Sequence, residues 1–435
     1  MPGISKAAKP NLAQTLEVLR SIVGDAGVRR GAPADAVCGV VPELCVEPAD
    51  EAELSRVLQY ANEAELMVSP RGGGTKLDWG TQPQGVDLAI STARFNRVLD
   101  YAPCDMTVTA GAGVSIAQLQ STLATHGQRL ALDPLWPERA TIGGVIATND
   151  SGALRVRYGG IRDLMIGATI ALADGTLAAS GGKVVKNVAG YDLPKLMAGS
   201  LGTLGIITRA VFRLHPLPEC SQTLSWTFAD CQRAKDFMLA ISDSLVVPSG
   251  VQMRTGGDRS VDVDVRIDCI AAGIEPQIEA VRRLAGEVRP TEPEAGPWQM
   301  REQLWKPGGD TNPSCILKLS VLPTQLASVA EFVRSSLGAT GWTLLMHSTG
   351  LGWLRLEFGE DGSMECARLA EFISVLRALL VSAGESAVLL QAPPGVREKV
   401  DVWGDAGSAL SLMMRIKQQF DPRGIFNRGR FVGGI

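Results

Sequence analysis

Residues 69–80 read SPRGGGTKLDWG, with three consecutive glycines between Arg71 and the pair Thr75-Lys76. Glycine costs backbone entropy inside a helix or strand, so such a run indicates that the backbone itself turns tightly or approaches a ligand closely. Backbone N–H groups in glycine-rich turns form concavities that bind anions. The stretch therefore predicts a phosphate-binding turn, in which Gly73 has a positive φ and lies close to the phosphate.

Two common phosphate-binding motifs do not fit this chain. A P-loop needs GxxxxGK followed by Ser or Thr, but Leu77 and Asp78 stand where the Gly-Lys pair would follow Gly72. A GxGxxG dinucleotide fingerprint begins at Gly111, but Ile116 replaces its last glycine, so the helix could not pack closely. The ligand and the fold must therefore be inferred from the sequence around the glycine run.

The residues before the glycine run predict a strand, a helix and a second strand. We expect strands at 43–47 and 66–69 and a helix at 50–64, with Asp50 as its N-cap and Glu53 three residues later. The second strand leads directly into the glycines. This order is typical of a compact βαβ-like unit.

The rest of the chain continues as a mixture of strands and helices. A strand at 106–110 and a helix at 115–125 repeat the earlier pattern, and Asp174-Gly175 joins two apolar runs as in a β-hairpin. Strands alternate with helices between residues 219 and 405, which predicts one sheet covered by helices. We predict an α+β protein with a helical segment at 1–39, domains at 40–218 and 219–405, and a closing helix and tail at 406–435.

The composition is that of an ordinary folded protein. Of 435 residues, 45% are hydrophobic and 20% charged, and the formal net charge is −4. This balance argues against nucleic-acid binding. The eight cysteines include no CxxC pair, so we predict neither an iron–sulfur cluster nor a zinc site. No apolar run reaches the ~18–20 residues of a membrane span, so we expect a cytoplasmic protein that reaches a membrane only through partners.

Three further glycine-rich segments accompany the first, at 133–163, 181–200 and 199–207. They contain ATIGG, ATNDSG and GTLGI in the same order and spacing as the FAD-binding domain of the vanillyl-alcohol-oxidase and para-cresol-methylhydroxylase flavoprotein superfamily, which this chain resembles. Within that superfamily the motifs are most similar to FAD-binding subunits of bacterial glycolate oxidases. The resemblance covers residues 40–217 and the tail, about half of the chain. It implies a two-lobed FAD-binding domain and a cap domain.

The resemblance also implies which residues bind FAD. Those expected at the pyrophosphate are Arg71, Gly72, Gly73, Gly74, Thr75 and Lys76. Those expected along the flavin and its phosphate arm are Asp133, Pro134, Thr141, Gly143 and Gly144. Those expected at the isoalloxazine and ribityl groups are Thr148, Asn149, Ser151 and Gly152. Those expected at the adenine end are Gly205, Ile206 and Ile207. In the tail, Asn427 keeps the asparagine of the family's closing turn, while Arg428 replaces its proline, so flavin contact and a simple turn both stay open for Asn427.

One departure concerns how FAD is attached. Some members of the superfamily bind FAD covalently through a histidine directly after the glycine run, where this chain has Thr75. The nearest histidine, His126, is far along the chain. We therefore predict dissociable FAD.

The region after residue 219 offers few groups for acid–base chemistry. Of the histidines His126, His215 and His347, only His347 lies there, without the paired histidines and glutamate that bind a divalent metal in relatives that oxidise D-2-hydroxy acids. We interpret it as structural and predict no metal site. The basic residues considered as substrate clamps are Arg254, Arg266, Lys318 and Arg355, on strands whose outer face should be solvated, with Lys186 and Tyr191 as alternatives in the flavin domain.

The resemblance finally implies partners. It favours an FAD-binding subunit of a glycolate (2-hydroxy acid) oxidase that works with a second FAD-linked subunit, which carries the substrate site, and with an iron–sulfur subunit. A self-sufficient FAD-dependent 2-hydroxy acid dehydrogenase is the alternative. A third possibility is a structural subunit with a vestigial flavin.

Overall fold

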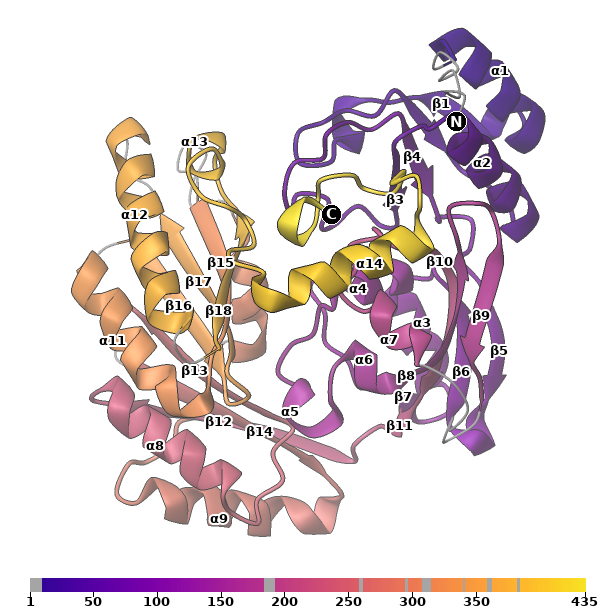
Figure 1. The fold of residues 1–435 in the computed structure, drawn as a ribbon. Helices are drawn as coiled ribbons and strands as arrows, with labels where there is room; N and C mark the ends of the chain where they lie inside the picture. Colours follow the sequence, from indigo (N-terminus) through magenta and orange to yellow (C-terminus); the bar gives the residue numbers. More distant parts are fainter. Residues whose placement is uncertain are drawn as a thin grey trace.

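The computed structural model describes residues 10–183, 192–257, 261–293, 296–306, 314–338, 341–357, 362–381 and 384–435, and the statements below concern these residues. Lys186 and Tyr191 lie outside them. The chain forms two bodies joined by a long C-terminal helix (Figure 1). We call the portion up to Pro216 the N-terminal part, and the seven-stranded sheet of residues 220–391 with its helices the cap.

The first sheet of the N-terminal part contains the glycine run at the end of one strand. Its strands lie in the order β1-β2-β4-β3, and β2 and β3 both run parallel to β4. The bounds are β1 Val28–Arg30, β2 Leu44–Val46, β3 Val68–Arg71 and β4 Leu88–Ser91, with helices α1 Leu12–Val23 and α2 Glu51–Glu63. Asp50 caps α2 by accepting from the backbone N–H of Glu53, as the sequence predicts. The turn of interest thus begins where β3 ends.

The second sheet of the N-terminal part is antiparallel, in the order β5-β6-β10-β8-β9. Its strands are β5 Val98–Ala102, β6 Thr107–Gly111, β8 Met165–Ala171, β9 Leu177–Gly181 and β10 Ile206–Arg213, and β7 Gln128–Arg129 pairs with β11 His215–Pro216. The helices of this region are α3 Ile116–Ala124, α4 Ile142–Thr148, α5 Arg155–Tyr158, α6 Ile161–Leu164 and α7 Leu193–Met197. The predicted hairpin across Asp174-Gly175 is confirmed as β8 and β9.

The cap is one antiparallel sheet in the order β12-β14-β13-β16-β17-β15-β18. Its strands are β12 Cys220–Phe228, β13 Gly250–Gly256, β14 Val261–Cys269, β15 Ser314–Ser320, β16 Trp342–His347, β17 Leu351–Glu357 and β18 Ser386–Gln391. Its helices are α8 Cys231–Ser242, α9 Ile274–Ala285, α10 Met300–Gln303, α11 Leu326–Leu337, α12 Gly362–Val381 and α13 Pro394–Arg397.

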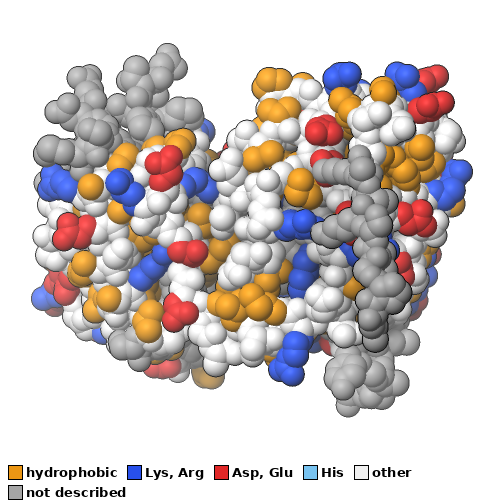
Figure 2. All heavy atoms as spheres, turned by 45° about the horizontal axis from the view of Figure 1, so that its top comes forward, with side chains coloured by type: hydrophobic (Ala, Val, Ile, Leu, Met, Phe, Trp, Pro, Cys, Tyr) orange, Lys and Arg blue, Asp and Glu red, His pale blue; other side chains and the backbone are white. Residues whose placement is uncertain are grey.

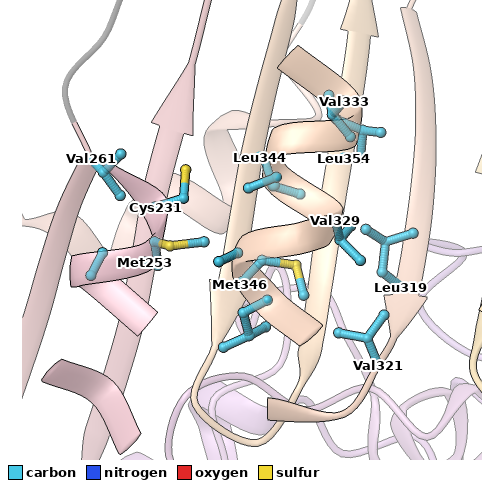
Figure 3. Packing of buried hydrophobic residues seen from close by; sticks show 14 of the residues in the cluster. Cys231, Met253, Val261, Leu319, Val321, Val329, Val333, Leu344, Met346 and Leu354 are labelled. Carbon is cyan, nitrogen blue, oxygen red and sulfur yellow. The ribbon is translucent and has the colours of Figure 1, made fainter. Parts of the chain in front are cut away.

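Helices α8, α9, α11 and α12 pack on one face of the cap sheet, and the other face is directed toward the N-terminal part. Val329 and Val333 of α11 lie against Leu344 and Leu354 of the sheet, all of them buried (Figure 3). Because side chains alternate along a strand, the residues between these core positions point to the opposite face. That face contributes part of the site described below.

The tail returns to the N-terminal part. Helix α14 (Leu410–Phe420) runs between the two bodies (Figure 1). After it, the backbone N–H of Val68 donates to the carbonyl of Ile425 and that of Asn427 donates to the carbonyl of Val68, both at 2.8 Å. Residues 425–427 therefore lie beside β3, next to the glycine run.

The surface carries charges of both signs, interspersed with apolar side chains over the face shown in Figure 2. This pattern agrees with the small net charge of −4. None of the helices among the described residues is both long enough and apolar enough to cross a bilayer.

Candidate functional site

A cleft in the N-terminal part brings most of the predicted FAD-binding residues together. It lies between the turn after β3, the start of α4, the start of β10 and the tail. The predicted residues that line it are Arg71, Gly72, Gly73, Gly74, Thr75, Lys76, Thr141, Gly143, Gly144, Thr148, Gly205, Ile206 and Ile207. Arg430 of the tail also lines the cleft, and the sequence analysis missed it.

The glycine run is packed against another backbone segment. A Cβ at Gly73 would lie 1.8 Å from the carbonyl oxygen of Arg139, and one at Gly72 would lie 2.1 Å from Oγ1 of Thr141. Gly74 has the positive φ of this turn, at 70°, while Gly73 does not. The expected positive φ at Gly73 is therefore wrong, because close packing against Arg139 and not backbone handedness requires glycine there.

The same turn offers backbone donors to the cleft. Gly73 donates to Oγ1 of Thr141 at 3.3 Å, but no described residue accepts a hydrogen bond from the backbone N–H of Gly72 or Gly74. Polar backbone groups are rarely left unpaired when they are shielded from water. Convergent N–H groups without side chains fit a diphosphate, which presents several acceptor oxygens.

Two cations of the cleft are already paired with carboxylates. Arg71 forms an ion pair with Asp35, whose pKa the hydrogen bond from Arg29 holds well below its usual range. Lys76 lies 3.1 Å from Asp150. Both carboxylates are buried, so these side chains hold the turn in place as well as adding positive charge.

Lys76 belongs to a buried charge cluster that links the two parts of the molecule. Asp150 accepts from Arg301 of the cap as well as from the backbone N–H of Leu135. Burial alone would raise the pKa of Asp150, but Arg301 and Lys76 lower it to about 2. Burial lowers the pKa of Lys76 despite this partner. Asp150 is therefore ionised at ordinary pH and joins the glycine turn to the cap.

Six other predicted residues do not line the cleft, and four of them are Asp133, Pro134, Ser151 and Gly152. The carboxylate of Asp133 accepts from the backbone N–H groups of Gly152 at 2.9 Å and Leu154 at 3.1 Å. Ser151 accepts from Arg155 at 3.3 Å. The hydrogen bond between Asp133 and Gly152 thus holds their two loops together. With Pro134, Asp133 and Gly152 line a second cavity, between the two parts.

The two predicted asparagines lie beside the cleft. Asn149 ends α4 with φ at 48°, and Asn427 donates from its side chain to the carbonyl of Leu201 at 2.6 Å. The side-chain oxygens of Asn149 and Asn427 are buried without a hydrogen-bond partner. Each of them can therefore accept a bond from a ligand or from water.

The second cavity has a volume of about 340 Å³ and lies between the cap sheet and the loops around Asp133 and Gly152. The cap contributes Gln252, Arg266, Trp298, Gln299, Arg301, Glu302 and His347 to its walls. Its size falls in the range of natural small-molecule sites. The sequence pattern does not reveal Arg301 as a site residue, because it is a single arginine in an irregular insert.

Two guanidinium groups of this cavity keep unpaired donors. Arg301 donates to the carbonyl of Asp133 at 3.2 Å and lies over the ring of Trp353, yet its Nε is buried without a partner. Arg266 donates to Ser249 at 3.2 Å, and one of its terminal nitrogens is likewise unpaired. Unpaired donors on buried cations favour an anionic ligand.

His347 stands on the cap strand β16 and also lines the cavity. It is 3% exposed, its Nδ1 has no partner, and its ring meets the edge of Trp353 at 5.1 Å between centroids. Burial, with the positive charges of Arg301, Arg155 and Arg266, lowers the pKa of His347 to about 3. The imidazole is therefore neutral at physiological pH, and it is a weak base unless a nearby anion offsets these positive charges.

The basic strand residues are buried or half-buried, so the predicted solvated outer face is wrong. Arg254 pairs with Asp264 at 2.6 Å, and Arg355 is 4% exposed. Lys318 has no partner among the described residues, and burial lowers its pKa to about 8. This face of the sheet is covered by the N-terminal part, which a strand pattern alone does not reveal.

The described residues contain no group of three or more His, Cys, Asp or Glu side chains arranged to hold a metal ion. The lining of the cleft contains no histidine, cysteine or tyrosine that could attach a flavin covalently. Both statements apply to the residues that the structure describes.

Comparison with known proteins identifies the cofactor. Residues 42–181 match the family described as "FAD binding domain". Gly72 to Lys76 and Thr141, which line part of the cleft, lie within this match, and the free backbone donors of this turn fit the diphosphate of FAD. FAD is therefore the cofactor of this chain.

The relatives are similar over different lengths. The chain is 34% identical to glycolate oxidase subunit GlcD of Bacillus subtilis over 49% of this chain and 45% of that protein. It is 28% identical to the mitochondrial cytochrome D-lactate dehydrogenase of Arabidopsis thaliana over 90% of this chain and 74% of that protein. At 34% identity, an Archaeoglobus fulgidus D-lactate dehydrogenase also matches over 45% of its length. The chain thus spans about half the length of the first of these relatives.

Solved structures confirm the predicted fold class. Para-cresol methylhydroxylase superimposes with a TM-score of 0.76 over 96% of both chains, at 14% sequence identity. Alkyldihydroxyacetonephosphate synthase superimposes with a TM-score of 0.74 over 98% of this chain and 87% of its own, at 16% identity. The chain has the two-lobed flavoprotein fold with a cap and a returning tail.

Proposed function

We propose that this chain is an FAD-dependent oxidoreductase that oxidises a small 2-hydroxy acid bound between the cap and the N-terminal part. The observation that carries the proposal is the second cavity, where unpaired arginine donors and a neutral histidine converge beside the FAD-binding part. The names of the relatives, glycolate oxidase and D-lactate dehydrogenase, point to the same substrate class. We assign residues 40–218 to the FAD domain and 219–405 to the cap.

The roles of the side chains follow from their charges and partners. Arg266 and Arg301 line the cavity and supply the positive charge that binds the carboxylate of the substrate. His347 accepts the proton of the substrate hydroxyl once the bound carboxylate offsets the arginine charges that lower its pKa. FAD, when bound, supplies the two-electron acceptor. The chain holds it non-covalently, since Thr75 stands after the glycine run and no histidine, cysteine or tyrosine lines the cleft among the described residues.

Anaerobic addition of glycolate, D-lactate or D-2-hydroxyglutarate to the purified, FAD-loaded chain tests this function. We expect the visible absorbance of the flavin to bleach with at least one of them. A flavin that stays oxidised with all three acids, but is reduced by dithionite, would contradict a substrate site in this chain.

A second candidate is a subunit of a glycolate oxidase complex, with a second FAD-linked subunit and an iron–sulfur subunit. The observation that favours it is helix α14, which has no buried residue and exposes Leu412 by 54% and Met414 by 47%. A partner could cover these apolar side chains. In this case the chain would stay in the cytoplasm or reach a membrane through its partners. Co-purification of an iron–sulfur protein with the tagged chain would support this candidate.

A further inference from the structure

Arg430 is an unusually placed cation. It lies in the tail, is 3% exposed, and lines the cleft that holds the glycine run. Its guanidinium donates to the backbone carbonyls of Leu77 at 2.7 Å and Trp79 at 3.1 Å, with a longer bond to Lys76 at 3.4 Å, and it also interacts with the neutral thiol of Cys38. Its Nε is buried and has no partner.

The charge of Arg430 is not balanced within the described residues. No carboxylate forms an ion pair with it, and Asp78, which acts on it electrostatically, is exposed and makes no contact. Burial lowers the pKa of Arg430, which is the direction expected of an uncompensated cation. A buried charge without a counter-ion is costly, so the fold must gain something from keeping it.

The other cations of the cleft differ in this respect. Arg71 is paired with Asp35, and Lys76 with Asp150. The diphosphate of FAD brings two negative charges into a cleft whose remaining free cation, among the described residues, is Arg430. Guanidinium groups bind phosphate oxygens with paired, directional hydrogen bonds.

We propose that Arg430 is the counter-ion of the FAD diphosphate, and that FAD thereby fixes the C-terminal tail on the N-terminal part. The backbone of Arg430 already anchors the tail, because its carbonyl accepts from the backbone N–H of Thr81 at 3.0 Å. Binding of FAD compensates the buried charge and removes the cost of docking the tail. The inference depends on FAD as the cofactor and not on the identity of the substrate.

The test compares Arg430→Gln and Arg430→Lys with a matched control, Arg428→Gln. Arg428 lies in the same tail and also donates to carbonyls, those of Gly424 and Arg423, but it does not line the cleft. FAD affinity is measured by titration of the deflavinated protein, and thermal unfolding is measured with and without FAD. The wild-type titration reports separately whether the chain binds FAD at all.

We expect Arg430→Gln to weaken FAD binding by roughly 10- to 100-fold, as for loss of a charge-assisted bond, without lowering the unfolding temperature of the apoprotein. Arg430→Lys should lie between this variant and the wild type, and Arg428→Gln should match the wild type. In limited proteolysis, FAD should protect the tail of the wild type but not that of Arg430→Gln. Unchanged FAD affinity in Arg430→Gln would overturn the proposal. The proposal would also be overturned if Arg430→Gln lowered the unfolding temperature of the apoprotein as much as that of the FAD-loaded protein, because that result indicates a purely structural role.

The diphosphate assignment has its own probe. ADP, which carries the diphosphate without the flavin, should raise the unfolding temperature of the wild-type apoprotein when added in large excess, and should do so less in Arg430→Gln. No stabilisation of the wild type, or equal stabilisation of both proteins, would overturn the assignment to the diphosphate.

Discussion

Replacing Gly73 by alanine tests whether the glycine turn holds FAD. The new Cβ would lie 1.8 Å from the carbonyl oxygen of Arg139 and 2.9 Å from its carbonyl carbon. Both atoms are backbone, so they cannot swing aside as a flexible side chain could. The turn or the segment before Thr141 must move by on the order of 1–2 Å to restore van der Waals contact.

The magnitude follows from the cost of overpacking. Forcing an extra carbon into a packed site typically costs about 1–3 kcal/mol. If the turn relieves the clash by moving, the N–H groups of Gly72 and Gly74 no longer converge. The free energy of FAD binding then becomes less favourable by a similar amount. We therefore expect the dissociation constant of FAD to rise by roughly 10- to 100-fold.

The assay is fluorescence titration of the deflavinated variant with FAD, together with the flavin content after purification. Gly182→Ala is the matched control, because a Cβ there meets no atom within 4 Å and the φ of Gly182 is ordinary. The control should bind FAD like the wild type. If Gly73→Ala retains full flavin content and an unchanged dissociation constant, the turn does not bind the diphosphate.

Three further predictions concern the charged groups between the two parts. Asp150→Asn should destabilise the protein by about 3–5 kcal/mol in chemical denaturation, because it leaves the buried cations Lys76 and Arg301 without their partner; a loss below 1 kcal/mol would contradict the charge cluster. Lys318→Met should stabilise the apoprotein by about 3 kcal/mol at neutral pH, because folding lowers the pKa of this amine from 10.5 to about 8 and the charged form is disfavoured in the folded state. The destabilisation by the charged Lys318 is fully present below pH 8 and disappears as the pH rises to 10.5, so the unfolding free energies of variant and wild type should converge at that pH. A difference that does not depend on pH would refute the lowered pKa of Lys318. His347→Gln should slow flavin reduction by 2-hydroxy acids by roughly 10²- to 10⁴-fold while FAD content is unchanged, and a rate equal to that of the wild type would exclude His347 as proton acceptor.

Most of the residues that the sequence assigns to FAD line one cleft, because each of them stands in a short local motif. The glycine run, Thr141 and the segment at 205–207 each stand in a short motif, and the structure brings them to one cleft. A glycine motif reports how closely backbones approach, which is a property of a few neighbouring residues. The reason for glycine at position 73 was nevertheless wrong, since the constraint comes from Arg139, which is distant in sequence.

The second cavity could not be predicted in the same way. Arg266, Arg301 and His347 come from separate elements of the cap, and their unpaired atoms are recognisable only once the N-terminal part covers the sheet. Lys318 and Arg355 follow the alternation of exposed strand residues, but the face they share is buried between the two parts. Arg430 was missed for a related reason, because the tail reaches the cleft through its pairing with β3.

The central claim is that this single chain both holds FAD and binds the acid that reduces it. The most direct measurement is anaerobic reduction of the isolated, FAD-loaded chain by 2-hydroxy acids, followed by flavin absorbance in the wild type and in Arg266→Met. The account predicts that the wild-type flavin bleaches and that Arg266→Met needs a much higher acid concentration for the same rate. A wild-type flavin that these acids reduce only after a partner flavoprotein is added would contradict it.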